Sequence, residues 1–310
     1  MSLGIVFPGQ GSQSIGMLAD LASAWPQVQK TFAEASVVLG YDLWELVQNG
    51  PADELNQTHI TQPAMLSAGV AVWRVWQENT SRMPSVMAGH SLGEYTALVC
   101  AGAISFPDAV GLVAERGRFM QEAVPAGTGA MAAILGLEDA QVVAACAEAA
   151  QDEVVSAVNF NSPGQVVIAG HASAVERAME TARAMGAKRA LPLPVSVPSH
   201  CALMQPAAER LALSLAEINL QLPQIPVINN VDVAVATDVE GVRDALARQL
   251  YSPVRWVETI QKMLADGVDT LIEAGPGKVL VGLNKRISKD MRVLAIVDTG
   301  SLDEAVASLK

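Results

Sequence analysis

Residues 89–93 read Gly-His-Ser-Leu-Gly and place Ser91 at the centre of a G-x-S-x-G pentapeptide. In this motif a tight strand-to-helix turn presents the serine hydroxyl, where it can act as a nucleophile. The flanking sequence fits, because residues 85–88 form a short apolar run and residues 94–101 can continue as a helix. The start of that helix would direct backbone N–H groups at an oxyanion. The pattern predicts nucleophilic chemistry, although a serine between glycines is also typical of an ordinary turn.

A serine nucleophile needs a base, and the chain has four histidines. His90 adjoins the serine, but neighbouring side chains on a tight turn point apart, so we interpret it as structural. His59 and His171 are expected at the surface. His200 lies in a proline-bearing stretch, and functional residues are often carried by such loops. His200 is therefore the candidate general base.

A third group would orient the imidazole, and no acid between Ser91 and His200 stands out for this role. The acids of that segment lie on helices and turns that read as exposed. A backbone carbonyl can orient a histidine as well, so the missing acid does not exclude a catalytic serine.

The composition limits the class of protein. The 310 residues are 51% hydrophobic and 17% charged, which is typical of a globular chain with a sizeable core. A net charge of −12 makes nucleic acid and anionic membranes unfavourable partners. No secretory signal or apolar run of membrane-spanning length is visible. The three cysteines argue against a disulfide framework, so we expect a cytoplasmic protein. Each is expected to be a small buried hydrophobic side chain, namely Cys100, Cys146 and Cys201.

Strands alternate with helices along the chain, which predicts a helix-covered, mostly parallel sheet of the α/β class. The expected strands are 3–7, 85–88, 227–231 and 270–273, and the expected helices are 22–39, 65–78, 94–101, 106–123, 242–250 and 257–265. Trp73 and Trp76 share one helical face and are expected in the core. Arg116 follows Glu115 on a helix, where a solvated salt bridge is the simplest interpretation.

Residues 127–196 have a separate pattern. Strands are expected at 131–135, 154–160, 166–169 and 189–193, with helices at 140–150 and 174–185. The order β-α-β-β-α-β is ferredoxin-like. We therefore predict an α/β-hydrolase-like catalytic core formed by residues 1–126 and 197–310, with an inserted ferredoxin-like subdomain formed by residues 127–196.

Two glycine-rich stretches do not fit nucleotide loops. Residues 9–11 read Gly-Gln-Gly, but the spacing to the next glycine fails the dinucleotide pattern. Residues 275–278 read Gly-Pro-Gly-Lys without the spacing or the following hydroxyl residue of a Walker loop. No histidine and cysteine cluster has metal-binding spacing, so no metal is expected.

The motifs together resemble those of the malonyl-CoA:acyl carrier protein transacylases, in the order and spacing of that family and over nearly the whole chain. They are Phe7-Pro-Gly-Gln-Gly-Ser-Gln13, Gln62-Pro63, Gly89-His-Ser-Leu-Gly-Glu-Tyr95, Arg116-Gly117, Asn159-Phe-Asn-Ser-Pro-Gly-Gln165, Pro198-Ser-His200 and Glu273-Ala-Gly-Pro-Gly277. The family's α/β-hydrolase-like core with a ferredoxin-like insert agrees with the fold expected from the element order.

The resemblance implies a role for each matching residue. Ser91 would carry the acyl group and His200 would be the base, oriented by the backbone carbonyl of Gln249. The backbone N–H groups of Gln10 and Leu92 would form the oxyanion hole. Two side chains would bind the acyl group: Arg116, through the free malonyl carboxylate, and Gln62, as part of the pocket wall.

The resemblance also implies the partners. These are malonyl-CoA and acyl carrier protein, with no metal or redox cofactor, and we expect a monomer. Because acyl carrier proteins are acidic, docking on an acidic enzyme requires a local basic patch. The candidate residues are Lys285 and Arg286, with Lys188 and Arg189 on the small subdomain. Ser199 precedes the histidine in the form seen in stand-alone fatty-acid enzymes, which favours malonyl without proving it.

Three alternatives remain at this point. The chain could be a serine hydrolase, in which water competes for the acyl-enzyme. It could be a transacylase for polyketide synthesis or malonate metabolism rather than for fatty acid synthesis. A catalytically silent docking protein is the third, and the intact set of Ser91, His200 and Arg116 argues against it.

Overall fold

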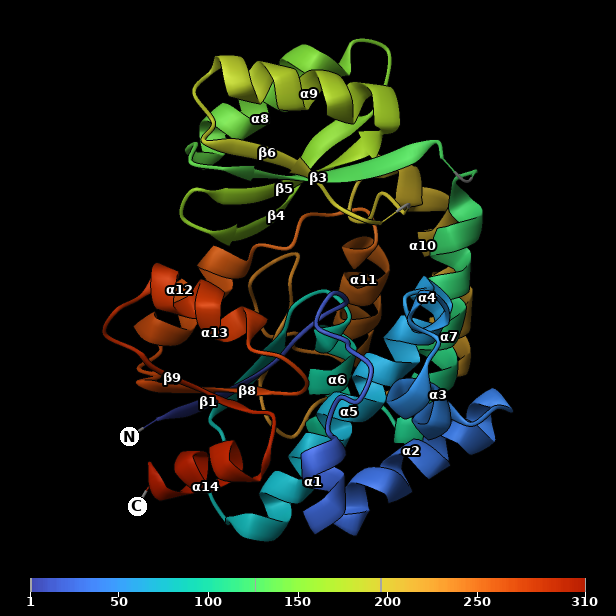
Figure 1. Ribbon diagram of the computed structural model, residues 1–310, viewed down its shortest axis with the longest axis vertical. Coiled ribbons are helices and arrows are strands. Elements are labelled where there is room, and N and C mark those ends of the chain that lie inside the picture. The colour runs from blue at the N-terminus through green and yellow to red at the C-terminus, as the bar shows by residue number, and fades with distance from the viewer. Residues whose placement is uncertain (1, 126, 196, 310) are drawn as a thin grey trace.

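The larger of two sheets has five strands. The computed structural model describes residues 2–125, 127–195 and 197–309. Neighbouring strands of this sheet pair in parallel, in the order β7 (Val227–Ile228), β2 (Val86–Gly89), β1 (Leu3–Phe7), β8 (Thr270–Ala274) and β9 (Arg292–Ile296). Helices cover both faces (Figure 1), so the predicted α/β class is confirmed.

Alternation along β1 explains the two helical layers, because successive strand residues point to opposite faces. Val6 packs with α12 (Trp256–Ala265) and α13 (Val279–Ile287). Ile5 and Phe7 pack into the larger core on the other face. The elements of that core are α1 (Ala19–Ala24), α2 (Pro26–Leu39), α3 (Leu43–Asn49), α4 (Ala52–Leu55), α5 (Thr58–Asn79), α6 (Gly93–Cys100), α7 (Phe106–Ala123), η1 (Ala202–Met204), α10 (Gln205–Glu217), α11 (Val239–Gln249) and α14 (Thr299–Ala307).

A second, four-stranded sheet forms the smaller lobe at the top of Figure 1. Its strands are antiparallel in the order β4 (Val155–Ser162), β5 (Gln165–His171), β3 (Gly129–Leu135) and β6 (Arg189–Pro192). Helices α8 (Asp139–Ala150) and α9 (Ala172–Ala184) cover one face. This order and topology confirm the ferredoxin-like insert. The exact division of the chain into domains stays a prediction, since residues 126 and 196 lie outside the described ranges.

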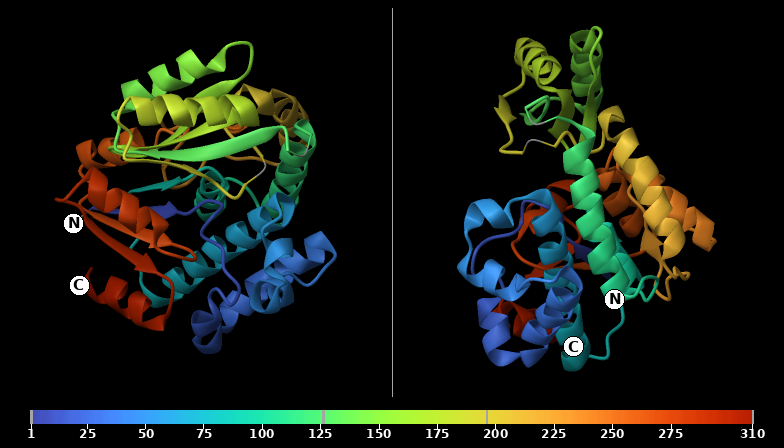
Figure 2. Two further views of the ribbon diagram at one scale, coloured as in Figure 1. Left: turned by 45° about the horizontal axis from the view of Figure 1, so that its top comes forward. Right: turned by 90° about the vertical axis from the view of Figure 1, so that its right-hand side faces the viewer.

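The two lobes are joined by backbone hydrogen bonds as well as by the chain itself. The Phe160 N–H donates to the Val254 carbonyl (3.0 Å), and the Val254 N–H donates to the Val158 carbonyl (2.8 Å). These bonds attach β4 to the segment just before α12, so the uncovered face of the small sheet lies over the larger lobe (Figure 2). The carboxyl ends of β1 and β2 therefore lie beneath the small sheet, where α/β folds bind their ligands.

Some predicted boundaries were wrong. The single helix expected at 22–39 is two helices, because Pro26 begins α2 and Trp25 before it is extended (φ −125°, ψ 97°). A residue before proline is disfavoured in helical conformation. The helix expected from residue 65 begins at Thr58 and continues through Pro63.

Two loops also differ from expectation. The strand expected at 227–231 ends at Ile228, because Asn229 accepts from the Asp232 N–H within a turn and Asn230 makes polar contacts beside the nucleophile. In the small sheet, β4 extends to Ser162 instead of ending at residue 160, so its turn to β5 contains two residues. The other expected helices and strands are confirmed, with ends that differ by a few residues.

The glycines of the pentapeptide are required by close backbone contacts. A Cβ atom at Gly89 would lie 1.8 Å from the carbonyl carbon of Gly93, and one at Gly93 would lie 2.1 Å from the carbonyl oxygen of Phe7. Between them, Ser91 adopts a positive φ of 51°. This conformation is uncommon for a residue with a side chain and stores strain at the turn. The first turn of α6 thus packs directly on the end of β1.

We expect Gly93→Ala to destabilise the protein by about 3 kcal/mol, because the new methyl group would force α6 away from Phe7. Chemical denaturation gives the free energy of unfolding. Gly282→Ala is the matched control, since a Cβ atom there meets no atom within 4 Å outside its own helix and chain neighbours. Wild-type stability in Gly93→Ala would contradict the close packing.

Candidate active site

Ser91 and His200 form a hydrogen-bonded pair. Ser91 lies on the turn between β2 and α6, and its Oγ is 2.8 Å from Nε2 of His200. His200 is buried and has a positive φ of 67°. Its backbone N–H donates to the Leu250 carbonyl (2.9 Å). The structure therefore brings together the two residues predicted as nucleophile and base, which are 109 positions apart in the chain.

The other ring nitrogen of His200 fixes its tautomer. Nδ1 lies 2.7 Å from the backbone carbonyl oxygen of Gln249. A carbonyl only accepts hydrogen bonds, so Nδ1 carries the proton and Nε2 is left to accept from the Ser91 hydroxyl. No carboxylate makes this contact within the described part of the chain, and the carbonyl occupies the position that an acid holds in a Ser-His-Asp triad.

The environment keeps the imidazole neutral. Burial, followed by the positive charge of Arg116, lowers the pKa of His200 from 6.5 to about 3, and the Gln249 carbonyl opposes this shift in part. A neutral imidazole is the form that can accept a proton. The free site is therefore ready for general-base catalysis well below neutral pH.

Arg116 lies beside the nucleophile. Its side chain is 1% exposed, and Nη2 lies 3.0 Å from Oε1 of Gln249 and 3.4 Å from Oγ of Ser91. The solvated salt bridge with Glu115 is not formed, because Arg116 points inward on α7 and the Glu115 carboxylate accepts from Ser214 instead. Burial lowers the pKa of Arg116, and the nearby Tyr95 and Glu94 partly oppose this shift. A guanidinium nevertheless remains charged in proteins.

Two backbone N–H groups are candidates for an oxyanion hole. Gln10 follows β1 and Leu92 precedes the first residue of α6, and both line the same cavity as Ser91. Within the described ranges, neither N–H has a hydrogen-bond partner. The helix dipole of α6 adds partial positive charge at this point. Both donors predicted for the oxyanion are thus near the nucleophile and available.

The cavity has a volume of about 240 Å³ and is walled by both lobes. Apolar side chains form most of its surface beyond the polar floor. They are Met120, Met131, Val167, Leu193, Val195 and Val197, together with Val279, Leu280 and Leu283 of α13. Such a cavity suits a largely apolar chain that ends in a reactive group at Ser91.

Gln62 was predicted to form part of the cavity wall, but it does not line the cavity. It is buried on α5, and its Nε2 lies 3.5 Å from Sδ of Met120, which is itself a lining residue. Gln62 therefore contacts a side chain of the cavity wall. Oε1 of Gln62 has no hydrogen-bond partner among the described residues.

The remaining histidines have structural contacts. Nε2 of His90 lies 2.7 Å from Oδ1 of Asn161 in β4, which links the two lobes, and burial lowers the pKa of His90. Nδ1 of His171 accepts from the Val154 N–H (2.9 Å). His171 and His59 are half-buried rather than fully exposed.

The cysteines behave as small apolar residues. Cys146 and Cys201 are buried, and Cys100 is half-buried. Burial raises the pKa of Cys201 to about 11 and that of Cys146 to about 12, so both are thiols at neutral pH. Sγ of Cys201 donates to the Pro198 carbonyl (3.1 Å). The prediction of a buried side chain is confirmed for Cys146 and Cys201, whereas Cys100 is half-buried.

Three polar groups behind the nucleophile were missed from the sequence. Oδ1 of Asn230 accepts from the Ser91 N–H (2.7 Å), while its Nδ2 donates to the Gly89 carbonyl (2.7 Å). Oε2 of Glu94 accepts from the Asn230 N–H (2.9 Å) and from Nε2 of Gln249 (2.8 Å). The Gln249 side chain also donates to the Ser91 carbonyl (3.0 Å). The one available signal was Glu94, an acid in an otherwise apolar segment.

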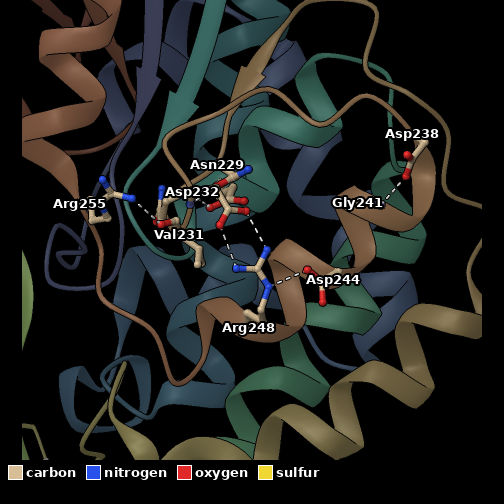
Figure 3. Close-up of polar contacts among 10 residues, drawn as sticks. Asn229, Val231, Asp232, Asp238, Gly241, Asp244, Arg248 and Arg255 are labelled. Atoms are coloured by element: carbon tan, nitrogen blue, oxygen red, sulfur yellow. Dashed lines mark hydrogen bonds and ion pairs between the residues drawn. The ribbon is translucent and has the colours of Figure 1, made fainter.

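An ion pair fixes the loops that carry these groups. Arg248 donates to both carboxylate oxygens of Asp232, at 3.0 and 2.7 Å, and also to Asp244 at 2.6 Å (Figure 3). Asp232 lies two residues after Asn230, and Arg248 directly precedes Gln249. The pair therefore holds the loop after β7 against the end of α11.

The predicted docking residues lie at one end of the small sheet. Leu135 pairs with Gln165 on one side and with Arg189 on the other. Nη1 of Arg286, at the end of α13, donates to Oε1 of Gln165 (2.7 Å). All four side chains are exposed there: Lys188, Arg189, Lys285 and Arg286.

Comparisons with known proteins agree with this geometry. A family model described as acyl transferase domain matches residues 5–304. The malonyl CoA-acyl carrier protein transacylase of Salmonella typhimurium is 62% identical over 301 residues, covering 97% of each chain. The crystal structure of an acyl carrier protein S-malonyltransferase from Vibrio cholerae is similar with a TM-score of 0.97 at 64% identity, covering 98% of this chain and 100% of that one.

A second solved structure is similar over the same length. It is a malonyl-transacylase in complex with a type II PKS acyl-carrier protein, with a TM-score of 0.98 at 60% identity, covering 99% of this chain and 100% of that one. The matched domain and the similarity extend over almost every residue that forms the site. The chain therefore belongs to the malonyl CoA-acyl carrier protein transacylases.

Proposed function

We propose that this enzyme moves a malonyl group from malonyl-CoA, through an ester on Ser91, to the pantetheine thiol of acyl carrier protein in fatty acid synthesis. One observation carries the proposal. The Ser91 hydroxyl lies between a neutral base, His200, and a buried guanidinium, Arg116. The first makes the serine nucleophilic, and the second suits an acyl group that ends in a carboxylate.

In the first half-reaction, Oγ of Ser91 attacks the thioester carbonyl while its proton passes to Nε2 of His200. The oxyanion accepts hydrogen bonds from the backbone N–H groups of Gln10 and Leu92. The C–S bond then breaks, and the departing sulfur of coenzyme A takes the proton back from His200. The products are a malonyl-serine ester and free coenzyme A.

The second half-reaction follows the same path in reverse. The pantetheine thiol gives its proton to His200, and the sulfur attacks the ester carbonyl of the acylated Ser91. When the tetrahedral intermediate collapses, the serine oxygen leaves and recovers the proton. One base therefore serves both attack and departure, in line with its single accessible nitrogen.

Substrate binding would change the charge balance of the site. Arg116 is one of the groups that hold the pKa of His200 low in the free enzyme. A bound malonyl carboxylate would neutralise part of that charge, so the pKa of His200 should rise when substrate is present. The base would thus become stronger when the correct acyl group is in place.

The apolar cavity and Arg116 favour transfer over simple hydrolysis. A serine hydrolase that acts on neutral esters has no use for a buried cation beside its nucleophile. The cavity walls also suit the pantetheine arm that coenzyme A and acyl carrier protein share. Hydrolysis of the acyl-enzyme is the competing outcome that the acylation experiment measures.

A polyketide carrier protein is a second candidate acceptor. The observation that favours it is the similar malonyl-transacylase solved with a type II PKS acyl-carrier protein. The same site would serve both, since the transferred group and the pantetheine thiol are the same.

We further propose a monomeric cytoplasmic enzyme that needs no metal or redox cofactor. Ser91, His200, Arg116 and the two backbone donors can supply each step of the proton and charge transfer, and all come from one chain. Within the described ranges, no helix has both the length and the apolar character needed to cross a membrane.

We also propose that exposed basic residues near the cavity bind the acyl carrier protein. Leu283 lines the cavity, and Lys285 and Arg286 follow it on α13, so these exposed charges lie close to the cavity wall. With Lys188 and Arg189 they form a local basic patch on a protein of net charge −12. Such a patch would attract an acidic carrier protein.

Mass measurement of the intact protein tests the proposed function. Mixing with malonyl-CoA should add one malonyl mass to the wild type and none to Ser91→Ala, because the ester needs the serine oxygen. Adding acyl carrier protein should remove the label and produce malonyl-acyl carrier protein. Stoichiometric labelling of Ser91→Ala, or loss of the label to water alone, would contradict the proposal.

The low pKa of His200 predicts a broad pH range for acylation. Since the active form is the neutral imidazole, the second-order rate constant for acylation, measured well below saturation so that it reports the free enzyme, should fall less than about twofold between about pH 7.5 and about pH 5.5. A histidine with an ordinary pKa of 6.5 would lose roughly tenfold over that range. Circular dichroism at each pH checks that the protein stays folded. A rate that follows a pKa near 6.5 would show that the base is not held neutral by its surroundings.

Charge reversal tests the basic patch. Lys285→Glu combined with Arg286→Glu should raise the KM for acyl carrier protein roughly tenfold at low salt, while acylation by malonyl-CoA stays unchanged. Lys30→Glu combined with Arg82→Glu makes the same change in net charge on exposed residues away from the patch and is the control. Equal effects of the two pairs on KM would place the docking surface elsewhere.

A further inference from the structure

The side chain of Gln249 makes contacts that the catalytic role of its backbone does not require. The backbone carbonyl orients His200, while the side-chain amide lies between Glu94 and Arg116. The residue is fully buried. We propose that Gln249 is a positioning residue for acyl selectivity: oriented by Glu94, its side chain holds Arg116 with Nη2 toward Ser91. This inference rests on the proposed function, because it deepens the role given there to Arg116.

The orientation of the amide follows from its partners. Its amino group faces three oxygens, Oε2 of Glu94 at 2.8 Å, the Ser91 carbonyl at 3.0 Å and, more distantly, Oδ1 of Asn230 at 3.5 Å. Each of these oxygens accepts hydrogen bonds, so the amino end must point at them. The carbonyl end is then left facing Arg116, whose nitrogens only donate. Exchanging the two ends would set donor against donor at the arginine and acceptor against acceptor at the other end.

The arrangement leaves Arg116 free for a ligand. A carboxylate in direct contact would occupy the guanidinium and compete with an acyl carboxylate. Instead, Glu94 lies beyond Gln249, and burial raises the pKa of its carboxyl group to about 7, so it carries only part of a negative charge at neutral pH. Nε of Arg116 has no hydrogen-bond partner among the described residues. A side-chain carbonyl thus fixes the arginine without neutralising it.

Glu94 acts through one oxygen. Oε2 accepts both from Gln249 and from the Asn230 N–H, and Asn230 in turn accepts from the Ser91 N–H. The positioning needs an acceptor at this point rather than a charge, because a neutral carbonyl oxygen can accept the same two bonds. Glutamine at position 94 should therefore replace glutamate, whereas leucine should not.

The test compares malonyl-CoA with acetyl-CoA, which lacks the carboxylate. Gln249→Met removes the side-chain amide but keeps the backbone carbonyl that orients His200. We expect the ratio of kcat/KM for malonyl-CoA to kcat/KM for acetyl-CoA to fall roughly tenfold or more, with the loss for malonyl-CoA appearing mainly in KM. Gln121→Met, an exposed glutamine on the arginine's own helix, is the matched control and should keep the wild-type ratio.

A double-mutant cycle separates this role from a merely structural one. If the amide acts through the arginine, Gln249→Met should cost little with malonyl-CoA once Arg116→Ala is present. Additive losses, or equal losses with both thioesters, would overturn the proposal. If the proposed function itself is wrong, Arg116→Ala alone will leave the preference for malonyl-CoA unchanged. That result distinguishes a failure of the proposed function from a failure of the role given to Gln249.

The Glu94 series keeps the proposal testable if Gln249→Met does not fold. Glu94→Leu should lower the ratio of malonyl to acetyl kcat/KM in the same direction, and Glu94→Gln should hold it within about threefold of wild type. Thermal unfolding of each variant reports on folding separately. A Glu94→Gln variant as unselective as Glu94→Leu would contradict orientation by the oxygen acceptor.

Discussion

A positive charge buried beside the nucleophile is the constraint on which the rest of the site depends. Moving a guanidinium out of water is costly unless it is paired and hydrogen-bonded. Here the Arg116 side chain is buried and donates to an uncharged amide oxygen, Oε1 of Gln249, at 3.0 Å. The carboxylate that would compensate it, on Glu94, lies on the far side of that amide. The free enzyme therefore holds an incompletely paired cation, and a substrate carboxylate is the natural partner for it.

This charge also explains why a backbone carbonyl orients the histidine. An aspartate against Nδ1 of His200 would bring a full negative charge into the same enclosed space and could pair with Arg116. The Gln249 carbonyl fixes the tautomer without adding charge. The cost is a weaker base in the free enzyme, because burial and the guanidinium lower the pKa of His200 to about 3. A thioester is an activated acyl donor, so a weaker base is compatible with the reaction.

The sequence predicted the nucleophile and its turn because the signal is local. Gly89 and Gly93 lie two residues either side of Ser91, between an apolar run and a helical segment. His200 was found among four histidines through its proline-bearing loop. The inward direction of Arg116 is a tertiary property, since α5 and α10 pack on α7 and decide which face is buried. Contacts such as Glu94 with Gln249, 155 positions apart, leave no local pattern. The break before Pro26 was a local signal that helical periodicity obscured.

Because one residue serves both functions, acyl selectivity and base orientation are coupled in this fold. The backbone of Gln249 contacts His200, and its side chain contacts Arg116. Replacing the arginine alone would leave Oε1 of Gln249 as a buried acceptor without a donor, which costs about 1–3 kcal/mol. A change of substrate from a charged to an uncharged acyl group therefore involves more than the arginine. The glutamine must find a new donor or be replaced by an apolar side chain, while its backbone stays in place for the histidine.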